Sequence, residues 1–146
     1  METADRVRAH TGRAQNRQVD QEIDERVRSY ATRSREEITA RIAELDREWD
    51  IERLLEMNAS ALAFTGLLLG VTRNRKWLIV SGIVLPFLFQ HAVQGWCPPI
   101  PVLRRLGVRT RKEIDREKYA LKTLRGDFEM AGEGDRAQSA LAAVKA

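Results

Sequence analysis

Cys97 is the only cysteine in the chain and the residue whose chemistry is easiest to define. A lone cysteine excludes an internal disulfide and any metal site built from several cysteines. Cys97 follows directly after an apolar segment, and the C-terminal end of a helix disfavours a thiolate. The cations Arg104 and Arg105 could offset that effect. A thiol or sulfur relay through Cys97 therefore stays open as an alternative function.

Five polar residues interrupt two otherwise apolar segments and form a second candidate site: Glu56, Asn58, Gln90, His91 and Gln94. In an antiparallel helical hairpin the first two and the last three would lie at the same depth, so we predict hydrogen bonds across the hairpin. The alternative is a proton or quinone-headgroup site built on His91 and Glu56, in an accessory subunit of a membrane redox complex. A lone histidine does not make a metal site, so we predict neither a metal nor a cofactor.

The elements that carry these residues are two uncharged stretches in a chain that is 32% charged. Residues 57–72 and 77–103 contain no Asp, Glu, Lys or Arg, and the basic turn Arg73-Asn74-Arg75-Lys76 separates them. About 20 apolar residues cross a hydrocarbon layer about 30 Å thick. We therefore predict an all-α protein in which 54–71 and 77–96 cross the lipid bilayer as a transmembrane hairpin. The alternative is that the hairpin forms the buried centre of a soluble helical oligomer.

Three tryptophans, Trp49, Trp77 and Trp96, lie at the ends of these segments. In a hairpin, Trp49 and Trp96 fall at one membrane interface and Trp77 at the other, where amphipathic rings are favoured. Eight basic residues lie near the hairpin on the side of the termini, against three in the turn. This excess predicts that both termini are cytoplasmic.

Small residues form a stripe on the first segment: Ala59, Ala63, Gly66 and Gly70. Small residues four positions apart allow helix backbones to approach closely in lipid. The sequence therefore predicts a tight helix contact, with either the second segment or another copy of the chain. Pro86 predicts a kink in the second segment.

The segment that leaves the membrane, 97–109, contains Pro98, Pro99 and Pro101. Such a cluster of prolines predicts an extended path along the interface rather than a helix. Basic residues in and after this segment predict contact with anionic headgroups at the membrane surface. They are Arg104, Arg105, Arg109, Arg111 and Lys112. Acidic residues interleave with the basic ones and no recognition motif accompanies them, so we predict no nucleic-acid binding.

A C-terminal helix is predicted over 110–126, because Thr110 and Glu113 have the spacing of a capping box and Gly126 is a stop signal. Ile114, Leu121 and Leu124 lie on one face of this amphipathic helix. The remainder, 127–146, is predicted to be a flexible tail.

The N-terminal part is predicted to have a disordered start over 1–16 and a charged amphipathic helical arm over 17–53. Along the arm, apolar residues recur every three or four positions, with a gap at Ser34. A narrow apolar stripe on a charged helix is typical of a coiled-coil seam, so we predict a homo-oligomer. The alternatives are that the arm rests on the membrane or on the C-terminal helix. The arm could also bind another membrane or cytoplasmic protein.

The residues Gly95-Trp96-Cys97-Pro98 resemble the bacterial inner-membrane YgaP-like transmembrane domain family, small two-helix hairpins with no assigned function. The similarity covers about 49–128 and includes Gly66-x-x-x-Gly70, Arg109-Thr110-Arg111 and Arg125-Gly126-Asp127-Phe128. Some members are fused to a sulfur-transferring rhodanese domain with its own catalytic cysteine, which this chain lacks. The resemblance implies an inner-membrane hairpin with a helical arm in place of an enzyme domain. The predicted function is that of a non-enzymatic membrane anchor, scaffold or recruitment module.

Overall fold

The computed structural model describes residues 6–128, and every regular element within them is a helix. The elements are α1 (Arg6–Ala9), α2 (Arg13–Tyr30), α3 (Arg35–Arg47), α4 (Ile51–Thr72), the short 3-10 helix η1 (Arg75–Trp77), α5 (Leu78–Gln94), α6 (Ile100–Arg105) and α7 (Arg111–Arg125). The predicted all-α class is confirmed, and so is the presence of two long apolar helices, α4 and α5. The predicted tail lies outside the described residues from residue 129 onward.

The described chain forms two compact units, and each is assembled from two separate parts of the sequence. Unit 1 joins the N-terminal part up to Val19 with Trp49–Arg111, and it contains α1, α4, α5 and α6. Unit 2 joins Asp20–Glu48 with residues 112–128, and it contains most of α2, all of α3 and nearly all of α7. The chain therefore leaves unit 1 and returns to it before it completes unit 2.

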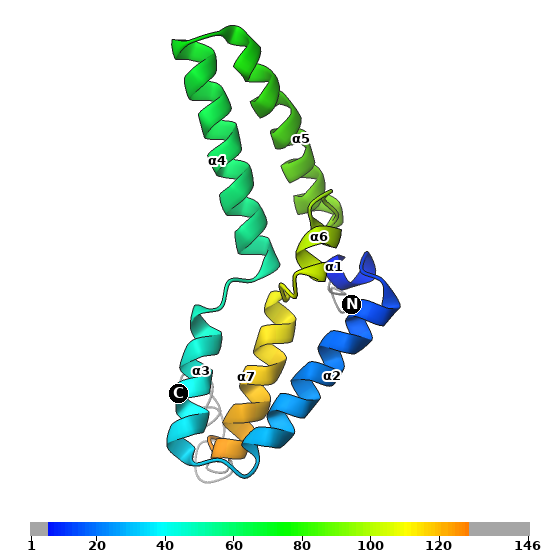
Figure 1. Cartoon of the computed structure of the whole chain (residues 1–146), viewed down its shortest axis with the longest axis vertical. Coiled ribbons are helices and arrows are strands. Elements are labelled where there is room, and N and C mark those ends of the chain that lie inside the picture. Colours follow the sequence, from blue (N-terminus) through cyan, green and yellow to red (C-terminus); the bar gives the residue numbers. More distant parts are fainter. Residues whose placement is uncertain (1–5, 129–146) are drawn as a thin grey trace, which may run out of the picture. The chain divides into compact units, whose positions relative to one another are not determined.

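In unit 1, α4 and α5 run antiparallel, side by side (Figure 1). Helix α4 begins after Asp50, whose side chain accepts a hydrogen bond from the backbone N–H of Arg53 at 2.7 Å, as an N-cap residue does. The Ser81 hydroxyl of α5 donates to the carbonyl of Ala63 in α4 at 2.7 Å. At about 1.5 Å per residue, the 22 residues of α4 extend over about 33 Å.

The predicted disordered start is wrong for the described residues 6–16, which form α1 and the beginning of α2. Val7 is buried in a cluster with Ile51, Cys97 and Ile100. Arg6 donates to the carbonyls of Ala92 and Val93 at 2.8 and 3.2 Å, and so satisfies acceptors that the end of α5 leaves open. The N-terminal residues pack against distant segments of the same chain, and local composition does not predict these contacts.

The predicted extended exit after α5 is also wrong, because Ile100–Arg105 forms α6. Pro99 is the N-cap of α6, and Pro101 lies in its first turn. The first backbone N–H groups of a helix have no intrahelical acceptor, so a proline there loses no hydrogen bond. Gly95 makes the reversal before α6 with φ 75°, and a Cβ at this glycine would lie 2.2 Å from Cβ of Arg6.

Unit 2 has its own apolar core, formed by Ile38, Ile42 and Leu45 of α3 with Ile114 and Leu121 of α7. The apolar residues of α3 that were predicted to form an oligomer seam are therefore buried within one chain. The interpretation of this part of the stripe as a coiled-coil seam is wrong, and the arm packs on the C-terminal helix. Leu124, predicted to share the buried face of α7, is instead 42% exposed.

The N-terminal arm is two helices, α2 and α3, and not one continuous helix over 17–53. Ser34 is the N-cap of α3: its hydroxyl accepts from the N–H of Glu37 at 3.2 Å, and the Glu37 carboxylate accepts from the N–H of Ser34 at 3.0 Å. These two bonds form a capping box. Ser34, which interrupts the apolar stripe, is thus the N-cap at which a new helix begins.

Candidate functional site

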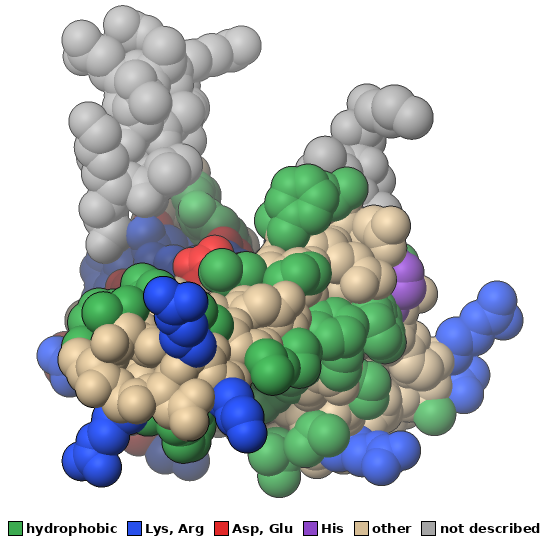
Figure 2. All heavy atoms as spheres, turned by 90° about the horizontal axis from the view of Figure 1, so that it is seen from above, with side chains coloured by type: hydrophobic (Ala, Val, Ile, Leu, Met, Phe, Trp, Pro, Cys, Tyr) green, Lys and Arg blue, Asp and Glu red, His purple; other side chains and the backbone are tan. Residues whose placement is uncertain are grey.

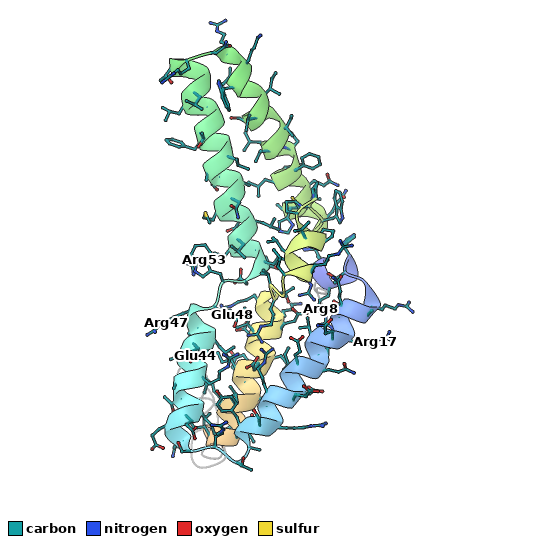
Figure 3. All side chains as sticks on the ribbon, in the orientation of Figure 1. Arg8, Arg17, Glu44, Arg47, Glu48 and Arg53 are labelled. Atoms are coloured by element: carbon teal, nitrogen blue, oxygen red, sulfur yellow. The ribbon has the colours of Figure 1, made fainter. Side chains whose placement is uncertain are left out.

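The most unusual surface of the described chain is the outside of the α4–α5 hairpin, where large apolar side chains are exposed. Hydrophobic side chains gather on the face seen in Figure 2, and in Figure 3 they project outward from both helices. The exposed fraction is 66% for Phe64, 78% for Val71 and 72% for Phe89. We call this the apolar hairpin surface, and its members are Met57, Leu62, Phe64, Leu67, Leu68, Val71, Trp77, Leu78, Ile79, Ile83, Leu85, Phe87, Phe89 and Val93.

Two windows of the described chain are long and apolar enough to cross a membrane. Both have a mean hydropathy of 1.5, and they lie within Arg35–Thr72 and Arg75–Gln94. The first range includes α3, but only α4 is uncharged over most of its length. A core helix of a soluble protein passes the same test and is mostly buried, whereas these windows are 17% and 6% buried. The apolar surface is thus left uncovered by residues 6–128, the part of the chain that the structure describes.

The stripe of small residues faces the second apolar helix of the same chain. Gly66 and Gly70 are buried, and a Cβ at Gly66 would lie 2.7 Å from the Ser81 hydroxyl oxygen and 3.1 Å from the carbonyl oxygen of Trp77. A Cβ at Gly70 would lie 2.5 Å from a methyl carbon of Leu78. Ala63 supplies the carbonyl that accepts from Ser81, and Ala59, like Ala63, is half-buried. The glycines therefore allow the close approach of α4 and α5.

The predicted hydrogen bonds between polar residues across the hairpin are not present among the described residues. Asn58 donates to the carbonyl of Leu54 in its own helix at 2.8 Å. Gln90 donates to Gln94, also within one helix, at 3.4 Å. The side chain that does reach across is Ser81, which the sequence reasoning missed. A small hydroxyl residue opposite an Ala-Gly stripe is the signal that could have identified it.

His91 is the one member of the polar set with an unsatisfied atom: its Nδ1 is buried and makes no hydrogen bond to the residues that the structure describes. Glu56 and Arg6 are the charged groups close enough to act on its ring electrostatically. Glu56 is thus within electrostatic range of His91, and Arg6 adds a positive charge that acts on the same ring. Within the described residues no group of His, Cys, Asp and Glu has the arrangement of a metal site.

Cys97 is buried in the apolar cluster of unit 1, beside Ile51, Leu55 and Ile100. Burial raises the pKa of its thiol, because a thiolate is poorly solvated among apolar groups. A reactive cysteine needs an exposed and electropositive setting. The surroundings of Cys97 are those of a core residue.

Two of the five predicted membrane-surface cations are buried in unit 1. Arg104 and Arg109 are each 4% exposed. Arg104 donates to the carbonyl of Val108 at 3.2 Å and to the side-chain oxygen of Asn16 at 3.1 Å. For Arg104 and Arg109 the surface prediction is wrong. Arg105, Arg111 and Lys112 are exposed.

Two of the tryptophans that were predicted to lie at a membrane interface, Trp49 and Trp77, are 41% and 46% exposed. The guanidinium of Arg53 lies 4.4 Å from the centre of the Trp49 ring, in a cation–π contact at the start of α4. An aromatic ring beside a cation at the end of an apolar helix is typical of a membrane interface.

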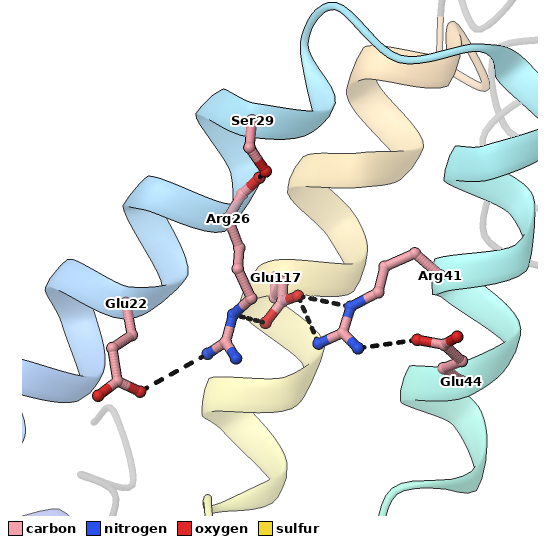
Figure 4. Close-up of polar contacts among 6 residues, drawn as sticks. All are labelled: Glu22, Arg26, Ser29, Arg41, Glu44 and Glu117. Atoms are coloured by element: carbon pink, nitrogen blue, oxygen red, sulfur yellow. Dashed lines mark hydrogen bonds and ion pairs between the residues drawn. The ribbon is translucent and has the colours of Figure 1, made fainter.

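Unit 2 contains a buried ionic network that the sequence reasoning missed (Figure 4). Glu117 of α7 is fully buried, and its carboxylate accepts from Nε and Nη2 of Arg41 at 3.1 and 3.0 Å. Nε of Arg26 lies 3.4 Å from the other carboxylate oxygen. Arg41 also donates to the exposed Glu44 at 2.9 Å. Glu117 stands between Ile114 and Leu121 at helical spacing, which is the signal that places it on the buried face.

No family model, curated protein or solved structure matches this chain.

Proposed function

We propose that this protein is a small integral membrane protein in which α4 and α5 span the bilayer and unit 2 works as a docking module in the adjoining aqueous phase. The observation that carries the proposal is the low burial of the two apolar windows, 17% and 6%. Moving a large apolar side chain out of water is favourable by about 1.5 to 3 kcal/mol of transfer free energy. A surface that exposes this many of them is therefore unfavourable in water. Hydrocarbon is the solvent that suits it.

The backbone of the hairpin supports the same conclusion. Helical hydrogen bonds satisfy polar groups internally, and that is the condition for crossing hydrocarbon. The hydroxyls of Ser60 and Thr72 also bond within α4, to the carbonyls of Glu56 and Leu68. These two hydroxyls thus find partners without water.

Unit 2 has the opposite character, which supports its role in water. Its helices carry ion pairs on their exposed sides, and Arg47 projects outward from the end of α3 in Figure 3. We infer that this charged module recruits a partner protein, while the hairpin anchors it. The bacterial inner membrane, cytoplasmic termini and a homo-oligomer remain predictions. A homo-oligomer would have to use a surface other than the apolar stripe of α3.

The surroundings of Cys97 and His91 bear on the two alternative functions. The burial of Cys97 and its raised thiol pKa disfavour a relay. Nδ1 of His91 and the nearby Glu56 favour the second alternative, an accessory subunit of a membrane redox complex. The similarity to the YgaP-like domains likewise remains a prediction, and the proposal does not depend on it.

Alkaline washing of membranes from cells that express the protein tests the proposal. We expect the protein to remain in the washed membranes and to be released only by detergent. Recovery as a discrete soluble particle would contradict the proposal, because the apolar hairpin surface would then be the core of a soluble oligomer. Cys97→Ser separates an anchor from a thiol relay: an anchor keeps its partner binding, whereas a relay loses its activity.

A further inference from the structure

The basic turn between α4 and α5 has a fixed backbone that projects three cations from the end of the hairpin. The N–H groups of Arg73 and Asn74 both donate to the carbonyl of Leu69, at 2.9 and 3.0 Å. The Asn74 side chain accepts from the N–H of Lys76 at 2.9 Å and caps η1. The backbone of the turn therefore needs no help from the charged side chains.

The cationic side chains of Arg73, Arg75 and Lys76 make no ion pair or hydrogen bond with any residue in the described part of the chain. Unit 2 differs in this respect, since Arg26, Arg41, Arg116, Lys118 and Arg125 all contact carboxylates. Three uncompensated positive charges within four residues are therefore a local feature of the turn.

A surface hollow of about 310 Å³ lies beside the turn. Arg73, Asn74 and Arg75 supply polar groups to its wall, and Gly70, Val71 and Leu78 supply apolar ones. A ligand that fits this wall carries a negative charge at one end and an aliphatic chain at the other. The planar guanidinium of arginine is suited to pairwise hydrogen bonds with a phosphate.

We propose that this turn is a binding site for an anionic phospholipid, whose phosphate contacts Arg73 and Arg75 and whose acyl chain lies against Val71 and Leu78. The inference rests on the proposed function, because a spanning hairpin puts the turn at the level of the headgroups. Lys76 adds a third positive charge that favours a lipid with net negative charge over a zwitterionic one. The site differs from the predicted surface cluster at 104–112, where two of the five cations are buried.

The test is native mass spectrometry of the full-length chain in detergent, titrated with dioleoylphosphatidylglycerol or dioleoylphosphatidylcholine. Basic residues near a membrane surface attract anionic lipids, so R73Q/R75Q/K76Q should bind the anionic lipid at least about tenfold more weakly than the unaltered chain. The matched control R13Q/R17Q/R28Q removes three exposed cations elsewhere and should bind as the unaltered chain does. R73K/R75K keeps the charge but loses the paired guanidinium donors, so its affinity should fall between those of the turn variant and the unaltered chain.

Equal affinity of the turn variant and the unaltered chain would overturn the site, and so would an equal loss in the matched control. Glycerol 3-phosphate distinguishes a lipid from a free phosphate: we expect no displacement of the lipid at equimolar glycerol 3-phosphate, and displacement would contradict a lipid ligand. Alkaline washing of the turn variant separates the two proposals. If the unaltered chain is washed off, the proposed function and this site both fail. If both chains stay in the membrane but bind the anionic lipid equally, only the site fails.

Discussion

The two units bury opposite kinds of side chain. In the hairpin of unit 1, glycines and a serine lie between the helices while Phe64 and Phe89 face outward. In unit 2, Ile42 and Ile114 lie inside together with a carboxylate, and charged residues cover the outside. Under the proposed function, the hairpin meets hydrocarbon and unit 2 meets water, and each arrangement suits its own solvent. The direction in which large apolar side chains point therefore indicates the solvent of each unit.

The largest expected effect comes from removing the buried charge of unit 2. Glu117→Ala leaves Arg41 and Arg26 without their shared partner, and breaking a buried ion pair on one side costs about 3 to 5 kcal/mol. Hydrogen exchange of the α7 amides in the detergent-solubilised full chain measures this loss. Glu44→Ala removes the exposed partner of the same arginine and should cost less than about 1 kcal/mol. A similar loss of stability in both variants would show that the buried ion pairs of Glu117 contribute no more than the exposed ion pair of Glu44.

A charge placed on the apolar hairpin surface should have the next largest effect. Phe64→Lys puts an ammonium in the middle of α4, and lysine at the centre of a spanning helix costs about 2.5 to 3.5 kcal/mol of insertion free energy. We expect a smaller fraction of the protein to resist alkaline washing. Leu124→Lys, at an exposed apolar position of unit 2, should leave that fraction unchanged. An unaltered fraction for Phe64→Lys would argue that the surface does not meet lipid.

Loss of the cap at the start of α3 should have a smaller effect. Ser34→Ala removes the hydroxyl that accepts from Glu37, and such a substitution typically costs about 1 kcal/mol. The loss should be confined to unit 2, so we expect faster hydrogen exchange in α3 and unchanged exchange in α5. Ser34→Asp is the control, because aspartate is also a good N-cap and should restore protection. Faster exchange in α5 would show that the two units do not respond independently.

The smallest expected effect is a pH dependence of the same cap. The pKa of Glu37 is lowered from its ordinary value of 4.5, first by the backbone hydrogen bond from Ser34 and then by the bond from Arg33. A carboxylate with a lowered pKa stabilises the folded state above its ordinary pKa, and this contribution disappears as the pH falls through the lowered value. Amide exchange in the first turn of α3 should thus become less protected below about pH 4.5, after correction for the intrinsic pH dependence of exchange. Glu37→Gln should lack this transition.

The sequence predicted the structure well where a single property, such as a long run without charge, determines it. An uncharged run of 16 residues and another of 27 leave few alternatives to two apolar helices, and both helices are present. It was misleading where one residue has two roles. Ser34 was interpreted as a gap in an apolar stripe, although Ser34 and Glu37 have the spacing of a capping box, and Pro101 was interpreted as a helix breaker although a first turn accepts it.

Contacts between distant segments could not be predicted from local pattern. Arg104 is predicted from local composition to be an exposed cation, but in the structure it is buried and bonds to Asn16, 88 residues away. Asn58 bonds within its own helix because the carbonyl of Leu54, four residues earlier, is within reach of its side chain. Ser81 bonds to α4 because the small residues there bring the two backbones close together.

The division of unit 2 between two distant sequence segments has a consequence for biogenesis. Arg41 and Glu117 are 76 residues apart, and the whole hairpin is synthesised between them. At about 5 to 20 residues per second, the ribosome needs about 4 to 15 s to pass from one to the other. During that interval the apolar face of α3 has no α7 to cover it, and both α4 and α5 are synthesised before α7 begins. Under the proposed function, the hairpin therefore becomes available for insertion before the bundle of unit 2 closes.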